Sequence, residues 1–157
     1  MLVKVSRRLT LEEVEKRTKE LEKTYEMTFD EFEEQLLTAR KMKEEYIDAY
    51  FRWARLVHAH RGYEEGGELH CIVEELRDLS SKELRAFTPK RLELLCALAD
   101  FRVESINELA RKVRRDVKNV HQDLQVLSRL GIVRTTRKRG KKIVPEVLVE
   151  EVTFVAK

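Results

Sequence analysis

Residues 117–130, VKNVHQDLQVLSRL, combine side chains that could recognise a polyanion with side chains that could form a core. At helical spacing Val120, Leu124 and Leu127 fall on one side, and we expect Val117 and Leu130 to extend that apolar stripe. The other side is rich in nitrogen donors and almost free of acid, since Asp123 falls away from it. Its members are Lys118, Asn119, His121, Gln122, Gln125 and Arg129. The pattern predicts a helix that buries one face and presents hydrogen-bond donors on the other.

This donor-rich face matches the chemistry of the DNA major groove. Lysine and arginine donate to guanine O6 and N7, and glutamine or asparagine can bond an adenine through two atoms. A recognition helix reads bases mainly through its N-terminal residues, which here are Lys118, Asn119, His121 and Gln122. An acid on that face would repel phosphates. We therefore predict that this helix enters the major groove.

The segment that follows, IVRTTRKRGKKIV, predicts two strands around a basic, glycine-bearing tip. It supplies six cations: Arg134, Arg137, Lys138, Arg139, Lys141 and Lys142. We expect them to lie along the DNA backbone or in an adjacent minor groove, where they would fix register rather than read sequence. Arg114 and Arg115 precede the helix and are expected to contact phosphates beside its N-terminus.

Start and stop signals define the elements that would position these residues. Thr88-Pro89 predicts a helix start, with the helix running to about Asp100, and Ser105 with Glu108 predicts a second helix. Asp116 is expected to cap the third helix, which stops at Gly131. A last strand is predicted in LVEEVTFVA. Three short helices followed by a hairpin is the order of a winged helix-turn-helix.

The first half of the chain predicts helices with an aromatic seam. LVKVSRR favours a short strand, and capping boxes at Thr10 and Thr28 open helices. Residues 28–61 predict one long helix whose seam includes Tyr46, Tyr50 and Trp53, either as core residues or as anchors for a protein partner. A shorter helix with Leu69, Ile72, Val73 and Leu76 inward is expected next. We thus expect a mainly α protein with a small β-hairpin wing, its residues 1–80 serving dimerisation or partner binding and residues 81–157 binding DNA.

Charge divides the 157-residue chain in the same way. Residues 102–142 hold 13 Lys+Arg against 4 Asp+Glu, whereas residues 1–80 hold 14 against 19. A basic block beside an acidic one suggests a polyanion partner for one half only. No apolar run reaches the length of a membrane span, MLVKVSRRLT is too short and polar for a signal peptide, and the two cysteines form no disulfide framework. The expected location is the cytoplasm.

Three stretches of the second half resemble a known family. FTPKRLELLCAL, followed by SINELARKVRRDVKNVHQDLQVLSRLGIV and the hairpin RKRGKKIVPEV, is similar to archaeal and bacterial winged-helix regulators of the MarR/ArsR-like superfamily, specifically those encoded as antitoxins beside small toxins. The resemblance spans about Phe87 to Phe154 and implies DNA binding by residues 117–130 and by the hairpin. Family members often carry glycine in the turn before the recognition helix, where this chain has Arg114. The first half resembles, more faintly, small archaeal antitoxin-type proteins, which implies that its acidic surface wraps a basic toxin.

Other functions have less support in the sequence. The main alternative is a ligand- or metal-responsive repressor without a toxin, with an effector pocket lined by Tyr46, Tyr50 and Trp53. His58 and His60 are two residues apart and His70 and Cys71 are adjacent, so neither pair is well placed to bind one ion, and we expect no metal or other cofactor. A ribbon-helix-helix beginning at VKVSRRLT is disfavoured by the glutamate-rich helix after it. The chain shows no motif typical of an enzyme.

Overall fold

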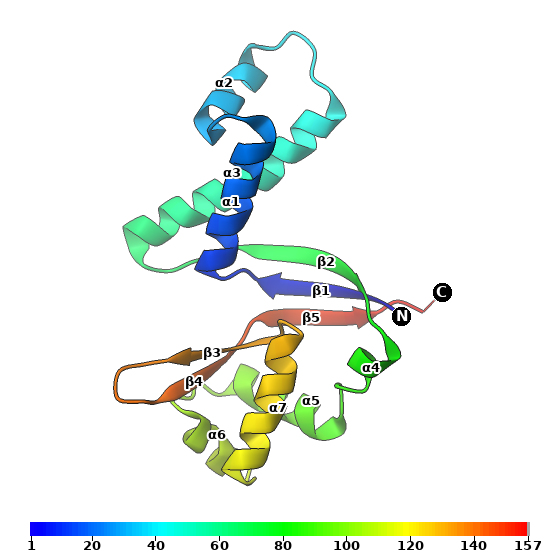
Figure 1. Cartoon of the computed structure of the whole chain (residues 1–157), viewed down its shortest axis with the longest axis vertical. Coiled ribbons are helices and arrows are strands. Elements are labelled where there is room, and N and C mark those ends of the chain that lie inside the picture. Colours follow the sequence, from blue (N-terminus) through cyan, green and yellow to red (C-terminus); the bar gives the residue numbers. More distant parts are fainter. Residues whose placement is uncertain (157) are drawn as a thin grey trace. The chain divides into compact units, whose positions relative to one another are not determined.

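The computed structural model describes residues 1–156 and divides the chain into two compact units (Figure 1). The sheet unit comprises Met1–Arg7 together with the chain from Glu74 onward, and the helical unit is Arg8–Val73. The helices of the chain are α1 (Leu11–Tyr25), α2 (Phe29–Thr38), α3 (Glu44–Gly66), α4 (Ser81–Leu84), α5 (Pro89–Asp100), α6 (Ile106–Lys112) and α7 (Val117–Arg129). The strands of the chain are β1 (Leu2–Arg8), β2 (Ile72–Asp78), β3 (Val133–Arg137), β4 (Ile143–Val147) and β5 (Val149–Phe154).

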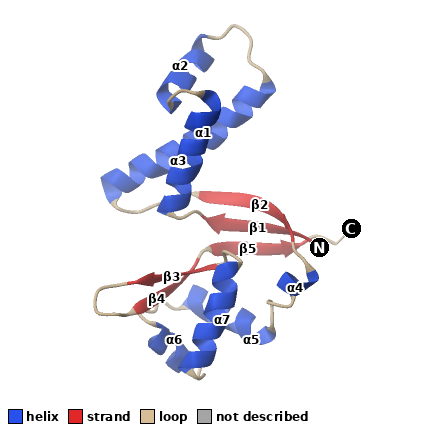
Figure 2. Cartoon of the chain, in the orientation of Figure 1, coloured by secondary structure: helices blue, strands red, loops and turns tan. Residues whose placement is uncertain are grey.

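A three-stranded sheet in the order β2-β1-β5 forms one part of the sheet unit (Figure 2). Strand β1 pairs antiparallel with β5, which places Val3 opposite Phe154 and Val5 opposite Val152. Backbone bonds from Leu79 N to Met1 O and from Leu9 N to Cys71 O join β1 and β2 near their ends in the antiparallel sense. Val3 and Val5 are buried because alternate residues of a strand face the same side.

The other part of the sheet unit packs α5, α6 and α7 against the β3–β4 hairpin. Its buried cluster takes residues from every one of these elements except β4: Leu94, Leu98, Ile106, Leu109, Val120, Leu124, Leu127 and Val133. The helix starts follow the sequence signals, since the side chains of Thr88, Ser105 and Asp116 each accept a backbone hydrogen bond from the first turn. Gly131 ends the α7 region at φ 69°, a left-handed conformation that glycine adopts at low cost.

The helical unit is built from α1, α2 and α3. Capping boxes at Thr10 and Thr28 are both formed, so these two helix starts were correctly predicted. Trp53 has no exposed surface and packs among the rings of Tyr25, Phe29 and Phe32. A second cluster gathers Leu9, Val14, Leu56, Ala59 and Cys71. This unit therefore has its own core of large aromatic side chains.

Two predicted elements were wrong. The single helix expected over residues 28–61 is interrupted between Thr38 and Glu44, because the chain turns to extended backbone at Ala39 and Lys43. The helix expected around Ile72, Val73 and Leu76 is strand β2, and Ile72 and Leu76 are exposed instead of inward. The protein is consequently mixed α and β, with helices and small sheets, and the units divide near residues 8 and 73 where the sequence suggested 80.

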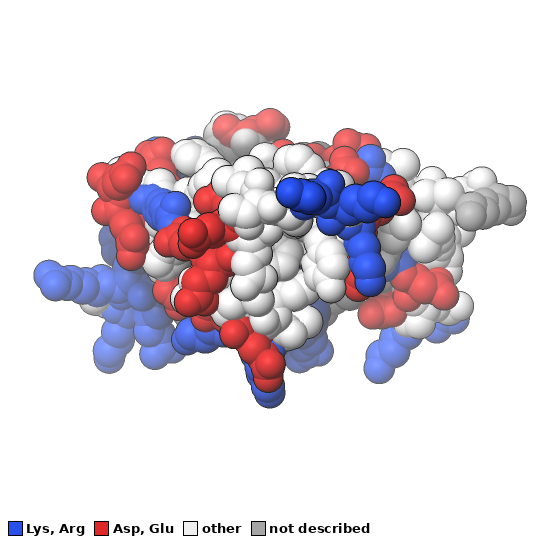
Figure 3. Space-filling model, turned by 90° about the horizontal axis from the view of Figure 1, so that it is seen from above, with Lys and Arg blue, Asp and Glu red and all other residues white. Residues whose placement is uncertain are grey.

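The aromatic residues proposed as partner anchors differ in accessibility. Trp53 is fully buried, so it belongs to the core and that part of the anchor prediction is wrong. Tyr50 is half-buried and donates from its hydroxyl to Glu33 Oε1 at 2.8 Å, while Tyr46 is 39% exposed. In Figure 3, uncharged side chains gather at the centre of the visible face, with acidic side chains on their left and basic side chains on their upper right. Of the three predicted anchors, only Tyr46 remains open to a partner.

No helix within residues 1–156 combines the length and apolar character that crossing a membrane requires.

Candidate nucleic-acid interface

The polar face of α7 is exposed as the sequence indicated. Lys118, Asn119, Gln122, Gln125 and Arg129 are all exposed, and the opposite stripe of Val120, Leu124 and Leu127 has no exposed surface. His121 is half-buried, and its Nε2 lies 3.3 Å from Gln125 Nε2 one turn later. The face thus presents two cationic and four other polar side chains on a helix whose back is anchored in the core.

Acidic side chains next to this face are occupied with structural hydrogen bonds. Asp116 Oδ1 accepts from the backbone nitrogens of Lys118 at 2.9 Å and Asn119 at 3.3 Å, which caps the helix. Glu108 accepts from the backbone nitrogen of Glu104 and helps to order the start of α6. Both carboxylates thus contribute one oxygen to hydrogen bonds that order a helix start.

A half-buried carboxylate joins α7 to its neighbours. Asp123 accepts from Arg91 Nε of α5 at 2.8 Å and from Arg115 Nη2 in the preceding turn at 2.6 Å. Burial raises the pKa of Asp123, but the hydrogen bonds and charges of Arg115 and Arg91 outweigh it and hold the pKa below its ordinary value. The group is charged at neutral pH and ties α7 to α5.

Arg115 consequently has a different role from the one predicted. Its side chain is 19% exposed and its guanidinium bonds Asp123, so it stabilises the helix packing instead of facing a phosphate. Arg114, the neighbouring residue, is exposed at φ 53°, a left-handed backbone conformation that costs an arginine about 1–2 kcal/mol. Of the pair, only Arg114 is free to meet a ligand.

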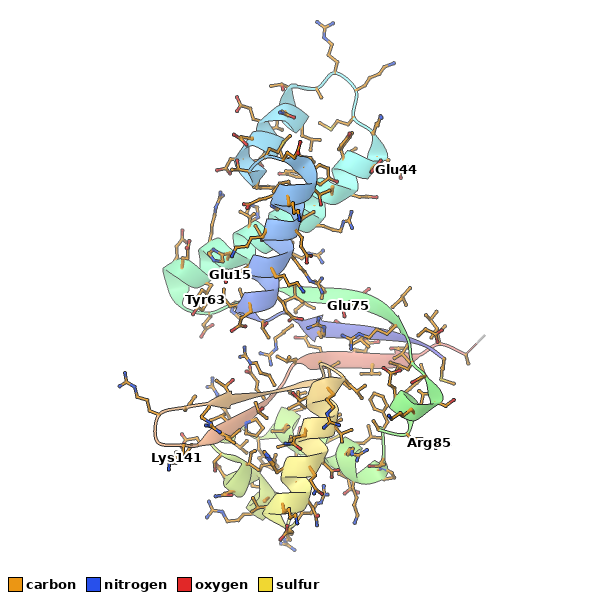
Figure 4. All side chains as sticks on the ribbon, viewed as in Figure 1. Glu15, Glu44, Tyr63, Glu75, Arg85 and Lys141 are labelled. Carbon is orange, nitrogen blue, oxygen red and sulfur yellow. The ribbon has the colours of Figure 1, made fainter. Side chains whose placement is uncertain are left out.

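The hairpin concentrates exposed cations at its tip. Arg137, Lys138, Arg139, Lys141 and Lys142 are exposed, and Figure 4 shows Lys141 at the loop. Lys141 also has a positive φ of 68°, next to Gly140 at 86°. Arg134 differs from the rest because its Nη2 donates to Glu146 of the paired strand at 2.8 Å. Its predicted backbone contact is therefore weakened by a partner within the hairpin.

A cleft of about 380 Å³ separates the start of α7 from the hairpin tip. Its walls come from three elements of the sheet unit, namely α6 with Ser105, Ile106 and Asn107, α7 with Val117 and His121, and the hairpin from Gly140 to Ile143. The lining is mixed: Lys141 and Lys142 are cationic, Ser105, Asn107 and His121 can form hydrogen bonds, and Ile106, Val117 and Ile143 are apolar.

Three contributors were missed by sequence reasoning. Arg91 was not singled out, because its contact with Asp123 joins residues 32 positions apart. Arg77 donates from Nη1 to the carbonyl of Leu130 at 2.6 Å and so binds the end of α7, a contact across 53 positions with no local signal. Val117 was placed on the buried stripe, but it is 43% exposed. Its position at the first turn of α7 could have signalled this, since a helix end is covered by fewer neighbours.

Among residues 1–156, no cluster of three or more histidine, cysteine or acidic side chains is arranged to bind a metal ion. His60 lines a cleft of about 490 Å³ in the helical unit. Its Nε2 lies 3.6 Å from Glu15 Oε1 and its Nδ1 lies 3.7 Å from Glu64 Oε1. The two cysteines are unpaired in the structure, with Cys71 buried and Cys96 exposed.

Comparison with known proteins gives one match. A family model described as HVO_A0114 matches residues 86–154, which is less than half of the chain. No curated protein and no solved structure matches. The matched segment begins three residues before α5 and ends with the last residue of β5. The similarity to the HVO_A0114 family therefore covers the three helices and the hairpin that carry the candidate interface.

Proposed function

We propose that this protein is a sequence-specific regulator of transcription that binds double-stranded DNA through a winged helix-turn-helix. In this proposal α7 is the recognition helix, its exposed polar residues read base edges, and the β3–β4 hairpin is the wing. The observation that carries the proposal is that one cleft is lined both by the start of α7, through Val117 and His121, and by the hairpin tip, through Lys141 and Lys142. The neighbouring acids Asp116 and Asp123 accept hydrogen bonds within the fold.

We assign the exposed side chains of this surface either to phosphates or to base edges. The exposed cations Arg114, Arg137, Lys138, Arg139, Lys141 and Lys142 lie outside the polar face of α7. We assign them to phosphates, where they supply affinity without sequence preference. Gln122 and Lys118 are assigned to bases because they are exposed in the first two turns of α7. Gln122→Ala should then change base preference, whereas Arg139→Ala should weaken binding to all sequences alike.

We further propose that the protein acts as a homodimer that represses its own promoter. A single small module gives modest specificity, and two half-sites one helical turn apart give much more. If each subunit neutralises about four to six phosphates, log K should fall with log salt at a slope of about −7 to −11.

We also propose that the protein is the antitoxin of a toxin-antitoxin pair and that its helical unit binds the toxin. The helical unit contains 11 Lys+Arg against 16 Asp+Glu, a net charge of −5, and it exposes Tyr46 and Phe51. An acidic surface with exposed aromatic side chains is suited to a basic protein partner. Co-expression with the product of the adjacent reading frame tests this part. A stable complex that Tyr46→Ala and Phe51→Ala weaken would support it, and separate elution of the two proteins would contradict it.

DNA binding is tested with the purified chain and a fluorescent duplex taken from upstream of its own gene, against a random duplex, at two salt concentrations. The charge-reversal pair Lys138→Glu and Arg139→Glu should lower affinity more than tenfold and flatten the salt slope. The matched control is Arg40→Glu with Lys41→Glu, two exposed cations of the helical unit, which should change neither. Absence of binding at low salt, or equal losses for both pairs, would contradict the proposal.

A further inference from the structure

An exposed valine occupies the part of α7 that the proposed function assigns to base reading. Val117 is the first residue of the helix, is 43% exposed, and lines the cleft beside His121, Lys141 and Lys142. The other exposed residues of this face are polar or charged. Val117 does not belong to the core cluster of this unit, which takes Val120, Leu124 and Leu127 from the same helix.

The position of Val117 restricts what it could contact. It begins α7 immediately after the cap, and Asp116 directs its carboxylate to the backbone nitrogens of residues 118 and 119. Residues in the first turn of a recognition helix approach base edges most closely. In the major groove, the one apolar group that a base pair presents is the C5-methyl of thymine.

We propose that Val117 reads a thymine through its C5-methyl group, so that the protein discriminates methylated pyrimidines from those that lack the methyl. This inference rests on the proposed function. It adds a specificity-determining residue that carries no charge and no hydrogen-bonding group. His121, one turn later on the same wall of the cleft, would flank the methyl from the polar side.

The test uses the full chain and DNA selected by the chain itself. A random duplex library yields the preferred sequence, which is then synthesised with deoxyuridine in place of thymidine, one position at a time. Uracil differs from thymine only by the methyl group. Burying one such group corresponds to about a three- to tenfold change in Kd. We expect a loss of this size at one thymine per half-site for the wild-type chain, and equal affinity for the two duplexes with Val117→Ala.

Two controls keep the result interpretable. Val117→Thr retains the shape but replaces one methyl by a hydroxyl, and it should discriminate less than the wild type. Both variants should unfold at the wild-type temperature, because Val117 is partly exposed at a helix end. With cytosine at the mapped position, its replacement by 5-methylcytosine should raise the affinity of the wild type by about three- to tenfold, and leave that of Val117→Ala unchanged, because only the methyl group is regained.

The outcomes separate this inference from the proposed function. Tight, selective binding with no effect of deoxyuridine at any position overturns the role of Val117 and leaves DNA recognition intact. Discrimination that persists in Val117→Ala shows that another residue reads the methyl, which also overturns it. A library from which no duplex is enriched would overturn the proposed function itself.

Discussion

Replacing Asp123 by asparagine should loosen α7 from α5. The carboxylate accepts two charge-assisted hydrogen bonds, from Arg91 at 2.8 Å and from Arg115 at 2.6 Å, and its side chain is 14% exposed. The amide of asparagine has one acceptor oxygen and no charge, so at least one arginine loses its partner. Arg115 Nη1 is already buried without a hydrogen-bond partner, so the loss of the Asp123 charge leaves this guanidinium poorly compensated.

The magnitude follows from the burial of the three groups. Breaking a fully buried ion pair by removing one partner costs about 3–5 kcal/mol, and a hydrogen bond to a charged group contributes about 1.5–3 kcal/mol. Because the arginines retain 22% and 19% exposure, solvent screens part of the loss. We expect the free energy of unfolding to fall by about 3 kcal/mol, which lowers Tm by about 6–12 °C for a chain of this length.

The effect should depend on pH in a defined direction. The pKa of Asp123 in the folded chain lies below its ordinary value of 3.8. A carboxylate with a lowered pKa contributes its full stabilisation above the pKa of the unfolded chain, and that contribution is lost as pH falls through the folded pKa. The stability difference between wild type and Asp123→Asn should therefore be constant from about pH 5 to pH 8 and shrink below the ordinary carboxylate range.

Urea unfolding monitored by circular dichroism at a series of pH values measures this difference. Glu93→Gln, which removes an exposed carboxylate from α5, is the matched control and should leave stability within about 0.5 kcal/mol of wild type. Arg115→Ala should destabilise by a similar amount to Asp123→Asn, and the double variant should cost less than the sum. An Asp123→Asn variant as stable as Glu93→Gln, or one whose deficit grows at low pH, would refute the assignment of this ion-pair network.

Three further changes have clear expectations. Arg114→Gly should raise the free energy of unfolding by about 1 kcal/mol, since glycine accepts φ 53° without strain. The same change should reduce the salt slope of DNA binding by about one per subunit. Unchanged DNA binding would contradict a place for Arg114 in the interface. Gly131→Ala should destabilise by about 1 kcal/mol because φ is 69° there, measured by thermal unfolding; a neutral result would contradict the left-handed turn. Trp53→Ala should cost about 3–5 kcal/mol by urea unfolding, and a loss below about 1 kcal/mol would contradict its place in the core.

Local signals in the sequence were enough to locate most of the helix starts. Thr10, Thr28, Thr88 and Asp116 each cap the helix that they were predicted to cap, because a cap depends on residues no more than three positions away. The buried stripe of α7 was likewise predictable from its period. For the candidate interface, the exposed polar residues of α7 and the cationic tip could be identified for the same reason.

Long-range contacts could not be predicted in this way. In β2, the side chains that alternate inward include Glu75 and Arg77, and Glu75 pairs with the buried Arg7. An ion-paired inner face conceals the apolar alternation of a strand, so the spacing of Ile72, Val73 and Leu76 suggested a helix. The partner of Arg115 lies eight residues later across a turn, and only the folded geometry shows that this arginine is occupied.

The path of the chain between its units has a consequence for dissecting the protein. The helical unit is inserted between β1 and β2, and its ends are joined by the hydrogen bond from Leu9 N to Cys71 O at 2.8 Å. Cutting the chain at residue 80 would therefore remove β1, the middle strand of the sheet, along with β2. Excising residues 10–70 and closing the gap with a tight turn would instead leave an ordinary hairpin. The helical unit is therefore a continuous insertion with adjoining ends, and a replacement for it would have to cover Leu9, Cys71 and Val73, which pack against its core.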